Sequence, residues 1–198
     1  MAFDAFDEGI ALGGVRSKTE VRILICYLLA SVDVPMTKEN VIDALLEKGL
    51  TNYFEASSCF DDLADRGNIK KLDDNPKYYV PTENGRTVAR DLADNLPLTV
   101  RERAYECALN LLLQEKNERE NKVSVEKCDH GYNMTCSISG GDMNLMEVSL
   151  FLADSDQVKT VKKNFYKNPQ LFYKVMIAVM TRNKALIKDA LQDLDNLA

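Results

Sequence analysis

The sequence predicts an α+β protein in two parts, and three patterns indicate this fold class. Residues 18–94 show helical periodicity interrupted by short turns, in the order helix, helix, helix, hairpin, helix. Residues 123–152 hold three segments in which apolar and polar side chains alternate, as in antiparallel strands with one apolar face. The segment 95–97 ends in a proline and separates the two patterns. A chain of 198 residues is long enough for two small domains, each with its own core.

The first two helices are marked by their apolar pattern and by their ends. Residues 18–31 carry apolar side chains on most sides, which is typical of a largely buried helix. The segment 33–35 ends this helix at a proline. Thr37 is the expected N-cap of a second helix, and Gly49 stands where the glycine after a helix C-terminus belongs.

The third predicted helix begins after Asn52, which forms a capping-box pair with Glu55. Its inward stripe is expected to consist of Tyr53, Ala56, Phe60, Leu63 and Ala64. The side chains expected to face outward are Asn52, Glu55, Ser58, Cys59 and Asp62.

A hairpin is predicted directly after the third helix. Its short flanks, 68–72 and 77–80, carry apolar residues and surround the turn-forming tetrad 73–76. Thr82 then caps a fourth helix. Helix, helix, short turn, helix, hairpin and helix is the order of a winged helix-turn-helix domain, with the hairpin as its wing.

The chain is therefore divided into an N-terminal arm (residues 1–17), a winged helix-turn-helix domain (18–96) and a second α+β domain (97–198). In the second domain we expect a helix capped at Thr99, a three-stranded antiparallel meander, and two or three helices covering the apolar face of the sheet. This domain is expected to serve dimerisation or sensing. Its first helix and the helix from Pro169 onward are the candidate interfaces of a homodimer.

Composition and motifs exclude several functional classes. No apolar run approaches the roughly 20 residues of a membrane helix, and the acidic N-terminus lacks the basic region of a secretory signal. A cytoplasmic protein without membrane contact is expected. The five cysteines contain no CxxC pair, and His130, between Cys128 and Cys136, is better explained as a turn residue than as a metal ligand. No catalytic motif is present, so we expect a non-enzymatic protein without cofactor or metal.

Segments spread over nearly the whole chain share their sequence with a known family. They are 22–29 (RILICYLL), 47–55 (EKGLTNYFE), 96–104 (LPLTVRERA), 120–123 (ENKV), 130–132 (HGY), 162–165 (KKNF) and Asn168 with Pro169. Through them the sequence resembles the domain-of-unknown-function family 4364, whose members are regarded as winged-helix transcriptional regulators. The resemblance supports the two-part architecture and implies a regulator, but it supplies no catalytic residue.

DNA binding would place the third helix in the major groove and the wing over a neighbouring groove. Asn52 and Ser58 are the candidates for contacts to base edges. The candidates for phosphate contacts are Lys70, Lys71 and Lys77 in the wing, Lys38 at the second helix, and Arg16, Lys18 and Arg22 near the first. Double-stranded DNA and a second copy of the chain are the expected partners; the sequence names no small-molecule effector.

The distribution of charge opposes a simple DNA-binding interpretation. Residues 1–96 contain 11 basic and 17 acidic residues, whereas the rest of the chain contains 14 of each. The third helix itself carries Asp61, Asp62 and Asp65 near its end. The alternative hypothesis is a winged-helix module whose acidic third helix binds a protein and not DNA.

Overall fold

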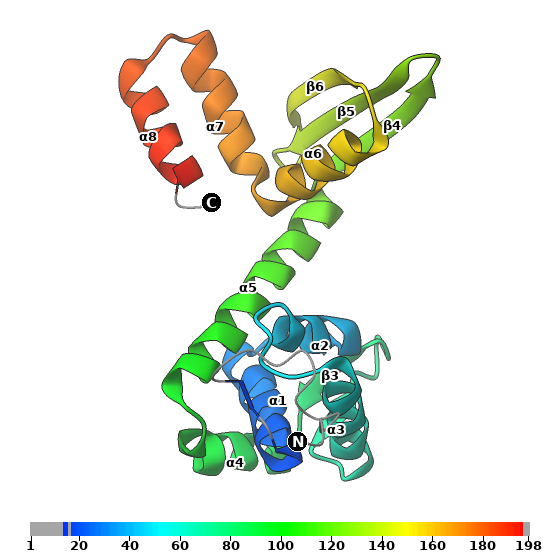
Figure 1. Cartoon of the computed structure of the whole chain (residues 1–198), viewed down its shortest axis with the longest axis vertical. Coiled ribbons are helices and arrows are strands. Elements are labelled where there is room, and N and C mark those ends of the chain that lie inside the picture. Colours follow the sequence, from blue (N-terminus) through cyan, green and yellow to red (C-terminus); the bar gives the residue numbers. More distant parts are fainter. Residues whose placement is uncertain (1–13, 16, 196–198) are drawn as a thin grey trace, which may run out of the picture. The chain divides into compact units, whose positions relative to one another are not determined.

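The computed structural model describes residues 14–15 and 17–195, and it confirms the α+β class. Within this part of the chain there are eight α-helices and two three-stranded antiparallel sheets (Figure 1). The chain divides into two compact units, one up to Leu112 and one from Leu113 onward. No helix in the described ranges is long and apolar enough to cross a membrane.

Helix α1 (Lys18–Val32) forms the centre of the first core. Ser17 and Glu20 make a complete capping box at its start, with both N–H···O contacts at 3.2 Å. Leu24, Ile25 and Leu28 are fully buried, so the helix is enclosed on several sides, as its sequence predicts. The helix ends at Asp33, which has a left-handed backbone with φ of 53°.

A short strand, β1 (Met36–Thr37), precedes α2 (Lys38–Leu46) and was not expected from the sequence. Met36 pairs with Tyr79 and Thr37 with Tyr78. Thr37 is also the N-cap of α2, as predicted, since its hydroxyl accepts from the N–H of Asn40 at 3.1 Å. A two-residue strand has no periodicity, so only its tertiary pairing reveals it.

The wing consists of β2 (Ile69–Lys71) and β3 (Tyr78–Pro81), which follow α3 (Tyr53–Asp65). Together with β1 they form an antiparallel sheet in the order β1-β3-β2. Next come α4 (Glu83–Leu92) and a 3₁₀ turn, η1 (Ala93–Asn95). This arrangement of helices and small sheet is winged-helix-like, which confirms the predicted architecture of the first part.

The base of the wing is tied to the ends of α3 and α4. The Thr82 hydroxyl donates to the carbonyl oxygen of Gly67 at 2.7 Å, and the Thr82 N–H donates to the carbonyl oxygen of Asn68 at 2.9 Å. Gly85, in the first turn of α4, packs so closely on Asn68 that a Cβ atom would collide with its carbonyl oxygen. A glycine is therefore required at this close approach.

Helix α5 (Leu98–Glu120) contributes to the first core with its N-terminal half. Val100, Ala104 and Cys107 are buried there together with side chains of α1–α4, so the first compact unit extends past the proline at which the sequence suggested a boundary. The predicted cap at Thr99 is wrong, because α5 starts one residue earlier and the carbonyl of Pro97 accepts from the N–H of Val100 at 3.0 Å.

The second unit contains a meander of β4 (Lys122–Cys128), β5 (Gly131–Ser139) and β6 (Asn144–Leu152), in the order β4-β5-β6. The register places Val123, Cys136 and Val148 side by side on one face. On the other face Thr135 lies between Ser124 and Ser149. The alternation read from the sequence thus separates an apolar face from a polar one.

Three helices follow the sheet: α6 (Ser155–Lys167), α7 (Pro169–Met180) and α8 (Lys184–Asp195). The core joins side chains of β5 with side chains of α6: Met134, Cys136, Ile138, Phe165 and Tyr166. The predicted caps of α6 and α7 are present. Where the sequence left open whether the last helix continues or restarts, the structure shows a restart, with a left-handed residue at Arg182.

Candidate nucleic-acid interface

The surface considered for DNA comprises the outer side of α3 and the wing. Asn52 lies at the N-terminus of α3, where its side-chain oxygen accepts from the N–H of Glu55 at 2.9 Å. The predicted cap is therefore present. The side-chain oxygen of Asn52, a candidate for base contacts, already accepts a hydrogen bond from the backbone of α3. Ser58 is exposed six residues further along, in the second turn of the helix.

The first turn of α3 exposes two aromatic rings. Phe54 is 81% and Tyr53 is 56% exposed, and their rings meet edge to face with centroids 5.9 Å apart. The predicted inward position of Tyr53 is thus wrong, and so is the predicted outward position of Cys59, which is 1% exposed. The buried stripe is Ala56, Cys59, Phe60 and Leu63. It follows helical spacing from the second turn onward and leaves the first turn at the surface.

The acidic side chains of α3 pair with cations from the neighbouring helices. The Nζ atom of Lys38 contacts both carboxylate oxygens of Asp61, at 2.7 and 2.8 Å. Lys18 Nζ lies 3.7 Å from Glu55. Two of the predicted phosphate-binding lysines are therefore placed against carboxylates of this same protein, in contacts that partly neutralise α3.

Asp62 is held between two arginines. Its Oδ1 atom accepts from Arg66 Nε at 2.8 Å, and its Oδ2 atom lies 2.6 Å from Arg22 Nε. The hydrogen bond from Arg66, together with the nearby Arg22 guanidinium, lowers the pKa of Asp62 below its ordinary value. Asp62 is consequently ionised at neutral pH, with its charge matched on both sides.

The three lysines of the wing have surroundings different from those of Lys18 and Lys38. Lys70 and Lys71 lie on β2 opposite Val80 and Tyr79, and Lys77 precedes β3. All three are exposed, and within the described part of the chain none forms an ion pair. The Lys71 Nζ atom lies 5.8 Å from the centroid of the Tyr79 ring. The structure thus groups these three candidates together.

Arg16, the remaining candidate, lies outside the described residues. The pairs that the sequence did not reveal join residues 23 and 40 positions apart, Lys38 with Asp61 and Arg22 with Asp62. No local pattern encodes such distances. The capping box of Ser17 and Glu20, by contrast, was present in the sequence as a Ser-x-x-Glu signature and could have been found.

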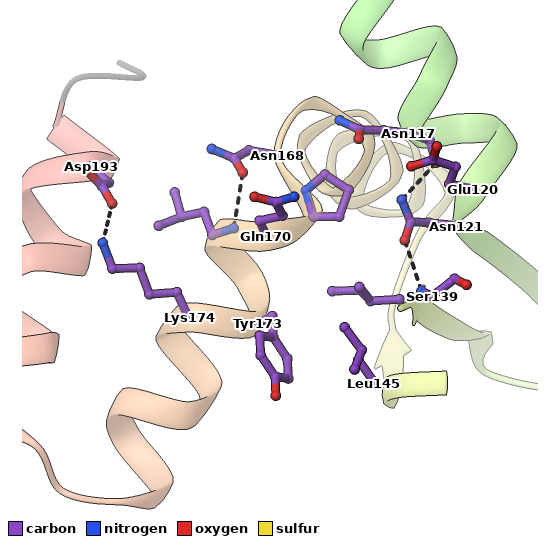
Figure 2. A pocket seen from close by; sticks show the side chains of 13 residues that line it. Asn117, Glu120, Asn121, Ser139, Leu145, Asn168, Gln170, Tyr173, Lys174 and Asp193 are labelled. Carbon is purple, nitrogen blue, oxygen red and sulfur yellow. Dashed lines mark hydrogen bonds and ion pairs between the residues drawn. The ribbon is translucent and has the colours of Figure 1, made fainter. Parts of the chain in front are cut away.

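The second unit contains a cavity of about 560 Å³ between the end of α5, the sheet and α7. Two of its amide side chains make hydrogen bonds that Figure 2 shows: Asn121 donates to Asn117 O and accepts from the N–H of Ser139, and Asn168 caps α7. At its rim, Lys174 Nζ lies 2.6 Å from Asp193. These hydrogen bonds and this ion pair join the elements around the cavity.

Candidate metal ligands do not gather in the described ranges: no three His, Cys, Asp or Glu side chains lie close enough to hold an ion. His130 is exposed in the turn between β4 and β5, and Cys136 is buried in the second core.

Comparison with known proteins identifies the family. Residues 21–180 match the family described as domain of unknown function (DUF4364), which is 160 of the 198 residues. No curated protein and no solved structure matches the chain. The matched segment includes almost all of α1, the wing, the β4-β5-β6 sheet and α7, so the chain belongs to the DUF4364 family.

Proposed function

We propose that this protein is a non-enzymatic transcriptional regulator of the cytoplasm that binds duplex DNA through its wing. The observation that carries the proposal is the contrast between two sets of cations. Lys18 and Lys38 are paired with carboxylates of α3, whereas Lys70, Lys71 and Lys77 are exposed and have no ion-pair partner among the described residues. Unpaired surface lysines are free to replace the counterions of a phosphate backbone.

The acidity of α3 does not oppose this proposal as strongly as its sequence implies. Asp61 and Asp62 are compensated by Lys38, Arg22 and Arg66 at 2.6–2.8 Å. A phosphate group approaching Asp61 or Asp62 therefore meets ion pairs, which reduces the local repulsion, whereas Asp65 remains an exposed carboxylate. The wing remains the part with available positive charge.

The first half of α3 carries a single charged residue, Glu55, which lies beside Lys18, and is suited to contacts with bases. Ser58 can exchange hydrogen bonds with base edges, and the exposed ring of Phe54 can contact the methyl group of thymine. In helix-turn-helix proteins the N-terminal residues of the recognition helix reach the base edges. The wing would then supply affinity, and the start of α3 would supply sequence preference.

The proposal is tested by titrating random-sequence duplex DNA at low salt and repeating the titration at several salt concentrations. The triple variant K70A/K71A/K77A is expected to bind more weakly, and the slope of log K against log salt should fall by roughly 0.9 for each lost phosphate contact. The matched control is K159A/K162A/K163A on α6, which removes the same charge from the second unit. Absence of binding by the wild-type protein would overturn the proposal; an unchanged slope would exclude the wing.

A second candidate function is protein binding, and the exposed aromatic pair favours it. Tyr53 and Phe54 form an apolar patch at the N-terminal end of α3, opposite the end that carries its aspartates, and aromatic residues are enriched at protein interfaces. This candidate predicts that the wild-type protein does not bind DNA at low salt. The DNA titration therefore separates the two functions.

A further inference from the structure

The two open edges of the β4-β5-β6 sheet differ in chemistry. The edge strand β4 carries three exposed charged residues, Lys122, Glu126 and Lys127. The other edge strand, β6, carries one, Glu147, and exposes apolar side chains: Leu145 (42%), Leu150 (39%) and Phe151 (60%). Natural proteins protect edge strands with charges or prolines because an open edge can pair with another strand. The β6 edge has only one such charge, Glu147.

Glu147 is engaged within the sheet itself. Its Oε2 atom accepts from the hydroxyl of Ser137 on β5 at 3.1 Å and from the amide of Asn144 at 3.4 Å. Among the described residues, the backbone of β6 makes ladder hydrogen bonds to β5 alone. β6 keeps a regular register with β5 from Leu152 to Met146, and the register shifts between Met146 and Asn144. Along the regular part, every second residue of β6 offers a backbone donor and acceptor at the outer edge.

We propose that β6 pairs antiparallel with β6 of a second copy, joining two three-stranded sheets into one continuous sheet. Full-length pairing of Asn144–Leu152 with itself is centred on Val148. In this register Met146 lies opposite the second copy's Leu150, and Glu147 lies opposite its Ser149. Met146 then meets Leu150 and the two Val148 side chains meet each other across the apolar face, and no carboxylate faces another.

Other registers are less favourable for the same strand. A shift by one residue would place the apolar face of one sheet beside the polar face of the other. Centring the pair on Glu147 keeps the faces matched, but it sets the two Glu147 carboxylates directly opposite each other, which is repulsive. The strand is therefore self-complementary in the register centred on Val148, and this favours a second copy over a foreign strand.

The hairpin of α7 and α8 also exposes apolar side chains, among them Val179, Met180 and Leu191. Nothing in that surface specifies an occupant, whereas the β6 edge specifies both the partner and the register. Pairing through β6 would also double the number of wings that one particle presents to DNA. The inference in this way extends the proposed function, but its test needs no DNA, so the two can fail separately.

The test measures the monomer–dimer equilibrium of the full chain by sedimentation equilibrium. The wild-type protein is expected to dimerise. Ser149→Glu places a carboxylate opposite the partner's Glu147 at two symmetry-related positions, and we expect the dissociation constant to rise at least about tenfold. Ser124→Glu is the matched control, because Ser124 faces the same Thr135 from the β4 edge; it should leave the equilibrium unchanged.

Two further variants separate loss of pairing from loss of folding. Ser149→Lys removes the same hydroxyl contact to Thr135 (2.8 Å) as Ser149→Glu, but it should retain or tighten the dimer, since the new cation faces Glu147. The double variant E147K/S149E places a lysine opposite a glutamate at both symmetry-related positions and should restore dimerisation. A monomeric wild-type protein at about 100 μM, far above the micromolar range of ordinary association, would overturn the inference. So would equal weakening by Ser149→Lys and Ser149→Glu, or dissociation by Leu191→Glu with none by Ser149→Glu.

Discussion

The Nε atom of Arg22 on α1 lies 2.6 Å from the Oδ2 atom of Asp62 on α3. Asp62 also accepts a hydrogen bond from Arg66 one turn further along its own helix. The charged contact therefore lies where α3 packs against α1, beside the buried Cys59 and its 3.6 Å contact with the carbonyl oxygen of Lys18. The orientation of α3 is consequently determined by charge pairing as well as by its apolar stripe.

Asp62→Asn should lower the free energy of unfolding in a pH-dependent manner. Because the pKa of Asp62 is lowered from 3.8 in the folded protein, the carboxylate stabilises the fold above that pH, and this advantage is lost as the pH falls through the lowered pKa. Urea unfolding of both proteins at pH 7 and pH 3 measures the difference. Asp65→Asn, at an exposed position of the same helix, is the control. An equal difference in the free energy of unfolding at both pH values would show that the charge of Asp62 does not stabilise the fold.

Asp61→Asn should strengthen DNA binding, if the proposed function holds. The change removes a negative charge and releases Lys38, which now contacts both oxygens of Asp61. We expect affinity at low salt to rise by up to about fivefold, the scale of an exposed ion pair. Asp189→Asn is the matched control, since it removes a carboxylate that contacts Lys174 in the second unit. Equal gains from both variants would indicate an effect of net charge alone.

Phe60→Ala should destabilise the protein by about 3–5 kcal/mol, because Phe60 is fully buried and its ring meets Tyr79 edge to face at 4.8 Å. Phe54→Ala, the same change at an exposed position of the same helix, should cost less than about 0.5 kcal/mol. Chemical denaturation gives both values. Similar losses of stability in the two variants would show that the buried and exposed faces of α3 are wrongly assigned.

The five cysteines should differ sharply in reactivity. Burial raises the pKa of Cys26 to about 12 and that of Cys107 to about 11, and it also raises the pKa values of Cys59 and Cys136. Cys128 is half-buried. At pH 8 a thiol reagent should modify one cysteine quickly in the native protein and five after unfolding. Cys128→Ser should abolish the fast phase; a fast phase that persists would contradict the burial of the other four.

Local signals predicted most of the fold. Thr37, Asn52 and Asn168 occupy the cap positions that their sequence context indicates, because a cap depends on a few neighbouring residues. The strand β1 and the phase of the first turn of α3 were missed, since both are decided by contacts between distant segments. The apolar pattern of α3 is compatible with more than one buried face, and only packing against α1 selects the face that includes Cys59.

The sequence predicted which residues belong to the candidate site, but it did not predict which of their charges are paired. Lysines in a hairpin are visible in a sequence, and the structure groups Lys70, Lys71 and Lys77 on the wing as expected. That Lys38 lies against Asp61 depends on how α2 meets α3, and either residue alone is equally compatible with a solvated surface. Tertiary contact, not composition, decides which charges remain available.

The hydrogen bonds of Thr82 have a mechanical consequence. This one residue bonds the carbonyl oxygens of Gly67 and Asn68 between α3 and β2, and its hydroxyl caps α4 through the N–H of Gly85. α3, the wing and α4 therefore share a single joint and cannot tilt independently at this point. A duplex meeting the wing would meet a surface that is already ordered, so little of the binding energy would be spent on arranging it.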